Sequence, residues 1–166
     1  MKSKFLTSLT VAVSLAAAGT GLISTAAMAV VPDSPSAVNT DVQGLALHGY
    51  DAVAYFTDGK PTKGNAKFKA TYEGATYYFA SEENQRKFNA NPAAYAPQFG
   101  GFCAMGVALE KKLDGDPNVW KIVDGKLYLN VNQDVAVAWN RDIPGNLDRA
   151  EENWPAIKDA TPESLN

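Results

Sequence analysis

The chain has 166 residues and carries 15 Lys and Arg against 18 Asp and Glu, for a formal net charge of −3. This acidic balance argues against nucleic acid and anionic membrane surfaces as partners. A single cysteine excludes an internal disulfide, and a single histidine excludes a two-histidine copper or iron centre. The length suits one domain with accessory segments.

The first 29 residues have the pattern of a secretory signal peptide. Lys2 and Lys4 precede an apolar run at residues 5–18, and Ala27-Met28-Ala29 forms an A-x-A cleavage site. The run is rich in Ala, Ser, Thr and Gly, which favours cleavage over a retained membrane anchor. We therefore expect a periplasmic or secreted protein that has no membrane contact after cleavage.

Three further segments follow the predicted signal peptide. Residues 30–43 are rich in Pro, Ser, Asp and Asn and are predicted to be a flexible linker without core residues. Residues 44–158 contain the apolar and aromatic positions of a single domain, and residues 159–166 are predicted to be a C-terminal tail.

The first half of the domain is predicted to contain a strand, a hairpin and a short helix. Val53, Tyr55 and Phe56 favour a strand after a bend at residues 49–51, and residues 57–61 form a turn. Residues 67–72 and 76–80 are predicted to form a hairpin around a two-residue turn. A helix is expected from an N-cap at Ser81 to about Asn89, with a further helical turn at residues 92–95.

The second half is predicted to add a hairpin and two helices. Residues 102–109 are read as extended, and residues 119–123 and 126–131 flank Asp124-Gly125, a strong hairpin signal. Residues 132–141 have helical spacing, Pro144-Gly145 is expected to break that helix, and a second helical stretch should end at Trp154-Pro155. The prediction is one small α+β domain of antiparallel hairpins and short helices.

Several separated motifs resemble the YHS domain, and more closely a group of exported bacterial YHS-domain proteins. The resemblance covers about residues 45–155. The motifs that carry it are Tyr72-x-Gly74-x-x-Tyr77-Tyr78-Phe79-x-Ser81, Phe88, Asn91-Pro92, Tyr95, Gly49-Tyr50-Asp51-x-Val53-Ala54-Tyr55-Phe56, Gly100-Gly101-Phe102-Cys103-Ala104 and Asp124-Gly125-Lys126-Leu127-Tyr128-Leu129-Asn130. The resemblance implies a metal-binding role. The family's metal-binding cysteines correspond here to Ala54 and Ala80.

Cys103, the only cysteine, is the principal candidate for a metal ligand. A thiolate suits Cu(I) or Zn(II), and an extended segment would put Met105 on the same face with a thioether. His48 is the only imidazole and could be a further ligand. The competing interpretations are a buried structural cysteine, a core methionine and an exposed loop histidine. A site with two or three ligands in one chain could be completed by a homodimer.

Tyr50, Asp51 and Tyr55 form a second candidate site. Asp51 could orient a ligand while tyrosine hydroxyls donate hydrogen bonds to it, or these residues could cap a turn and pack the core. The first hypothesis is an exported, non-catalytic module that handles a metal ion, with copper as the expected metal. The alternatives are a small-molecule or protein binding module without metal and a thiol-dependent redox enzyme in which His48 activates Cys103.

Overall fold

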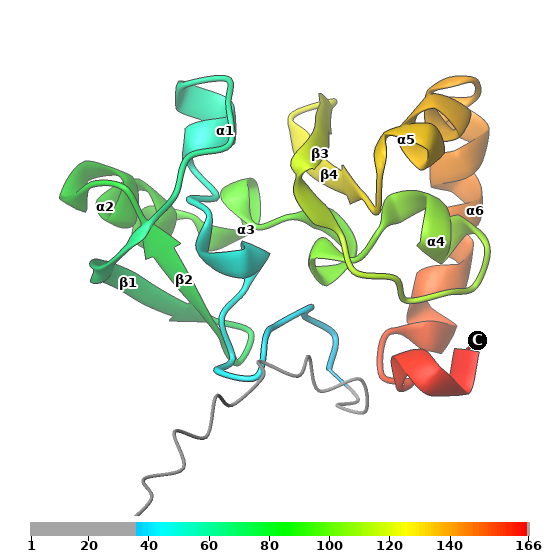
Figure 1. Ribbon diagram of the computed structural model, residues 1–166, viewed down its shortest axis with the longest axis horizontal. Helices are drawn as coiled ribbons and strands as arrows, with labels where there is room; N and C mark the ends of the chain where they lie inside the picture. Colours follow the sequence, from blue (N-terminus) through cyan, green and yellow to red (C-terminus); the bar gives the residue numbers. More distant parts are fainter. Residues whose placement is uncertain (1–35, 166) are drawn as a thin grey trace, which may run out of the picture.

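The computed structural model describes residues 36–165, so the predicted signal peptide at residues 1–29 lies outside them. The described chain is an α+β fold with two antiparallel hairpins, as predicted (Figure 1). None of its helices is long and apolar enough to cross a membrane. The elements in chain order are η1 (Leu47–Gly49), α1 (Ala54–Thr57), β1 (Asn65–Tyr72), β2 (Ala75–Phe79), α2 (Glu82–Ala90), α3 (Pro92–Tyr95), η2 (Gln98–Gly101), α4 (Ala104–Ala108), β3 (Asp116–Val123), β4 (Lys126–Asn130), α5 (Gln133–Asn140), α6 (Ile143–Ile157) and η3 (Pro162–Leu165).

The β1–β2 hairpin and α2 form as the sequence predicts. Glu73 and Gly74 both have positive φ, which is the backbone of a type I′ turn and matches the twist of the two strands. The Ser81 hydroxyl accepts a hydrogen bond from the Asn84 amide at 3.1 Å and caps α2. Phe88 of α2 is fully buried against the ring of Phe79, which joins the helix to the hairpin.

The prediction of a strand at Val53–Phe56 is wrong, because this segment begins α1. The buried carboxylate of Asp51 accepts hydrogen bonds from the backbone amides of Val53 at 2.8 Å and Ala54 at 3.3 Å. These bonds close a turn that leads the chain directly into a helix. Val53 and Tyr55, two of the β-forming residues of this segment, are buried here by tertiary packing, which overrides their local preference.

The β3–β4 hairpin lies between two hydrophobic clusters. Leu127 and Leu129 pack into the cluster built around β2 and α2, whereas Tyr128 packs into the cluster beneath α4, α5 and α6. This alternation follows from the period of two in a strand. Tyr55 also reaches this hairpin, because its hydroxyl donates to the Pro117 carbonyl at 2.9 Å and its ring meets Trp120 edge-on. The hairpin therefore joins the two parts of the fold.

The prediction of an extended segment at residues 102–109 is also wrong, because α4 occupies most of it. The Cys103 sulfur accepts a hydrogen bond from the Gly106 amide, and the Asn130 side-chain oxygen accepts one from the Met105 amide at 3.3 Å. Both bonds satisfy amides that a helix N-terminus leaves without a partner in the helix. Cys103 and Met105 consequently do not share the face of a strand.

The last helix is longer than predicted. The predicted helix at residues 132–141 is confirmed as α5, which ends at Asn140. The second helix, α6, begins before Pro144-Gly145 and runs through Trp154-Pro155, where we expected it to end. Asp142 caps its first turn by accepting from the Gly145 amide, and Pro144 stands where a helix does not use its amide for an internal bond. Pro155 lies in the final turn and removes one internal bond there, and the helix ends two residues later at Ile157.

Residues 36–42 form a docked segment, which we call the N-terminal strap. The expectation of a linker without core residues is wrong here, because Val38 is only 2% exposed and belongs to the first hydrophobic cluster. The Asn39 amide donates to the Gly100 carbonyl at 2.9 Å. A Cβ at Gly100 would collide with the Ala37 carbonyl, so glycine is required for this close approach.

Candidate functional site

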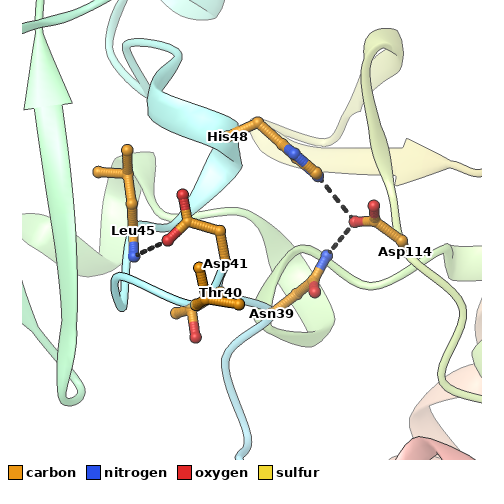
Figure 2. A pocket seen from close by; sticks show the side chains of 7 residues that line it. Asn39, Thr40, Asp41, Leu45, His48 and Asp114 are labelled. Carbon is orange, nitrogen blue, oxygen red and sulfur yellow. Dashed lines mark hydrogen bonds and ion pairs between the residues drawn. The ribbon is translucent and has the colours of Figure 1, made fainter. Parts of the chain in front are cut away.

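A histidine–aspartate pair lies where the N-terminal strap meets the two parts of the fold. The His48 Nε2 and the Asp114 Oδ1 are 2.8 Å apart, and both side chains are nearly half exposed (Figure 2). Leu47 and His48 both have positive φ, a conformation that is strained for residues other than glycine. Such strain persists only where surrounding structure holds it, and it is concentrated at functional sites.

The pair is electrostatically coupled. The hydrogen bond to Asp114 raises the pKa of His48, although partial burial opposes this. Burial disfavours the ionised form of Asp114, but the hydrogen bonds from His48 and Asn39 outweigh it and lower the pKa of the carboxyl. The two groups therefore exist as a partly buried ion pair at mildly acidic pH.

Two hollows open on either side of this pair, and we call them together the His48 cleft. The first, of about 240 Å³, is lined by Asn39, Thr40, Asp41, Val42, Leu45, His48 and Asp114. The second, of about 410 Å³, is lined by His48, Tyr50, Asp114, Asp116, Pro117, Asn118 and Val131. His48 and Asp114 line both hollows. Figure 2 shows the side chains that surround the first hollow, with the strap on one side and Asp114 on the other.

Tyr50 is the predicted ligand-binding residue that the structure places in the cleft. It is half-buried and lines the second hollow. The Lys63 ammonium lies 3.9 Å from the centre of its ring and also donates to the His48 carbonyl at 3.2 Å. The ring face of Tyr50 therefore already attracts a cation at this edge of the cleft.

Asp51 and Tyr55, the other two predicted ligand-binding residues, have structural contacts. Asp51 is fully buried, and its carboxylate also accepts from the Ala80 amide at 2.8 Å and the Asn84 side-chain amide at 2.7 Å. Tyr55 is 1% exposed, and burial raises the pKa of its hydroxyl. Both residues support the backbone beside the cleft and do not line either hollow among the described residues.

None of the described hydrogen bonds joins Cys103 or Met105 to His48. Cys103 is fully buried, its thiol donates toward the Asn130 oxygen at 3.5 Å, and burial raises its pKa. Met105 packs against the second hydrophobic cluster. Across residues 36–165, no group of three or more His, Cys, Asp and Glu side chains is arranged to hold a metal ion. The contacts of Cys103 are those of a helix cap.

Sequence reasoning missed Asp114, Asn39 and Asp116. Asp114 and Asp116 stand in a segment that reads as a polar loop, and Asn39 stands in the predicted linker. No local spacing pattern distinguishes them from ordinary loop residues. Only the folded chain brings Asn39 and Asp114, 75 residues apart, into a hydrogen bond.

Comparison with known proteins places one part of the chain in a family. The YHS domain family matches residues 53–99. The chain contains a YHS domain. The matched segment holds α1 to α3 with the β1–β2 hairpin and contains the predicted motifs from Tyr72 to Tyr95, whereas the motifs at residues 100–104 and 124–130 lie outside it. No curated protein and no solved structure matches the chain.

The YHS domain does not itself contain the His48 cleft. Every described residue that lines the two hollows lies before residue 53 or after residue 99. The YHS domain contributes the core against which these flanking segments pack. For example, Asp51 of the preceding segment accepts hydrogen bonds from the Val53 and Ala54 amides at the start of α1. The cleft is therefore built by segments on both sides of the domain.

Proposed function

We propose that this YHS-domain protein is a non-catalytic binding module that takes a small cationic ligand in the His48 cleft. The observation that carries the proposal is the His48–Asp114 pair, which is partly exposed and shared by both hollows and whose histidine has a strained, positive-φ backbone. Concave sites with a few convergent polar groups are the usual location of small-molecule binding.

The charges around the cleft favour a cation. Asp41, Asp114 and Asp116 line the two hollows, and His48 is the single basic side chain among the described lining residues. Tyr50 adds an aromatic face that already attracts the Lys63 ammonium. Carboxylates and an aromatic ring together suit a primary or quaternary ammonium group. An organic ammonium compound is accordingly the first ligand class.

A transition-metal ion is the second candidate, as the family resemblance implies. Metal-bound histidines commonly hold a carboxylate on the other ring nitrogen, which is the arrangement of His48 with Asp114. We assign the proposed ion to His48 and not to Cys103, because the Cys103 sulfur is buried and already accepts a hydrogen bond from the Gly106 amide. Copper fits an imidazole nitrogen, and Cu(II) is the form that imidazole and carboxylate favour.

The test is a titration followed by amide NMR spectra of the protein. Putrescine and choline serve as organic cations, Cu(II) and Zn(II) as metal ions, and acetate as the anionic control. Saturable shifts or broadening confined to residues around His48 and Asp114 support the proposal, and His48→Gln should weaken them by about tenfold. Equal effects in His48→Gln, or changes centred on Cys103, would contradict it.

The same titration separates the two ligand classes. Binding of putrescine or choline without an effect of Cu(II) supports the organic cation, and the reverse result supports the metal ion. In either case Asp116→Asn, which removes one charge from the second hollow without touching the His48–Asp114 pair, should weaken binding less than Asp114→Asn. Absence of binding by all four cations overturns the proposal.

A further inference from the structure

Asn39 and His48 meet the same oxygen atom of Asp114. The Asn39 side-chain amide donates to Oδ1 at 2.6 Å, and the His48 Nε2 contacts that atom at 2.8 Å (Figure 2). The same amide also lies 3.4 Å from the Gly101 carbonyl. A carboxylate that accepts two bonds on one oxygen has little freedom to rotate away from either donor.

Asn39 is itself held in place by backbone contacts on the N-terminal strap. Its main-chain amide donates to Gly100, and the preceding residue, Val38, is buried in the first hydrophobic cluster. A further hydrogen bond holds the start of the strap, because the Ser36 carbonyl accepts one from the buried Lys112 ammonium at 2.7 Å. These contacts are independent of the Asn39 side chain, so the strap presents that side chain to Asp114 from a fixed backbone.

We propose that Asn39 is a positioning residue of the His48 cleft, which fixes the Asp114 carboxylate and thereby the orientation of the His48 imidazole. The N-terminal strap therefore forms part of the binding site. Four of its residues line the first hollow, namely Asn39, Thr40, Asp41 and Val42. The ligand-binding consequence rests on the proposed function. The positioning itself does not.

Two other charged groups act on His48 and must be kept constant in a test. Asp41 favours the protonated imidazole through space, and Lys63 disfavours it. Neither group contacts the Asn39 side chain in the described hydrogen bonds. A change at Asn39 therefore reaches His48 through Asp114.

The test is the pH titration of the His48 imidazole by NMR in the wild-type protein and in Asn39→Ala, without any ligand. If Asn39 holds the carboxylate in place, its loss lets Asp114 rotate away, and the pKa of His48 falls toward the ordinary value of 6.5. If Asn39 is only a competing donor, its loss strengthens the His48–Asp114 bond, and the pKa of His48 stays constant or rises. The second result overturns the proposal.

Asn118→Ala is the matched control. Asn118 donates its side-chain amide to Asp116 at 3.1 Å in the same cleft, so this change removes an equivalent amide–carboxylate bond without touching the pair. The titration of His48 should be unchanged in it. If Asn39→Ala does not fold, Asn39→Leu replaces it, because leucine keeps the side-chain size and removes the donor. The pKa of His48 should then fall in Asn39→Leu. Because no ligand is present, failure of putrescine or metal binding leaves this test unaffected.

Discussion

His48 and Asp114 are 66 positions apart in the sequence, and their side chains meet at 2.8 Å. Both residues lie outside the segment that matches the YHS domain. The contact joins η1, which precedes that domain, to the segment between α4 and β3, which follows it, so the pair forms only when these two segments have docked. Its ionisation should therefore be visible in the stability of the protein.

The first prediction concerns the dependence of stability on pH. The folded pKa of His48 lies above 6.5, so its stabilising effect is fully present below pH 6.5 and is lost as pH rises through the folded value. The folded pKa of Asp114 lies below 3.8, so its effect is present above pH 3.8 and is lost as pH falls through that lower value. The pair should stabilise the fold between these limits by about 0.5 kcal/mol, since it is partly exposed.

Urea unfolding of the wild type and His48→Gln at pH 5.5 and pH 9 measures this effect. The two proteins should differ more at pH 5.5 than at pH 9. A constant difference at both pH values would show that the imidazole contributes through packing and not through its charge.

The second prediction concerns the buried carboxylate of Asp51. Asp51→Ala removes the acceptor for three backbone amides and the Asn84 side chain. Donors left without a partner in the interior are costly, so the free energy of unfolding should fall by about 3 kcal/mol. Chemical denaturation measures it, with Asp58→Ala at an exposed position as the control. A loss no larger than that of the control would contradict the structural role of Asp51.

The third prediction concerns the reactivity of Cys103. Because the thiol is fully buried and its pKa is raised, iodoacetamide should modify it only as fast as the protein opens. The alkylation rate should rise with urea in parallel with unfolding, and Cu(I) should not protect the folded protein. Rapid alkylation of the folded protein at neutral pH would restore Cys103 as a metal-binding or redox candidate.

The fourth prediction concerns Lys112, which is 2% exposed and has no carboxylate partner among the described contacts. Its ammonium donates to the carbonyls of Ser36, Lys158 and Ala160, which fastens the N-terminal strap to the end of α6. Lys112→Met should lower the free energy of unfolding by about 2 kcal/mol, because it leaves these carbonyls without their donor.

Limited thermolysin digestion reports on the strap directly. Cleavage near Val38 should be faster in Lys112→Met than in the wild type, whereas Lys111→Met, at the neighbouring half-buried position, should leave the rate unchanged. Equal resistance of Lys112→Met and the wild type would show that the Val38 and Asn39 contacts hold the strap without Lys112.

The sequence by itself determined the elements whose signals are local. Asp124-Gly125 and Glu73-Gly74 adopt the positive-φ turns that their hairpins need, and Ser81 caps α2 through its own hydroxyl. Each of these features depends on residues within a few positions of one another, so a sequence pattern is enough to predict it. The motifs around Tyr77 and Phe79 likewise identified the YHS domain.

The tertiary structure alone decided the N-terminal strap and the cleft. The helices α1 and α4 are intermediate cases: residues 54–57 and 104–108 are too short for helical periodicity to show, and Asp51 and Cys103 cap their first turns locally. By contrast, the bond from the Met105 amide to Asn130 comes from a distant part of the chain. Asn39, His48 and Asp114 have no motif of their own. They meet because the strap crosses Gly100, where only the absence of a Cβ allows that approach.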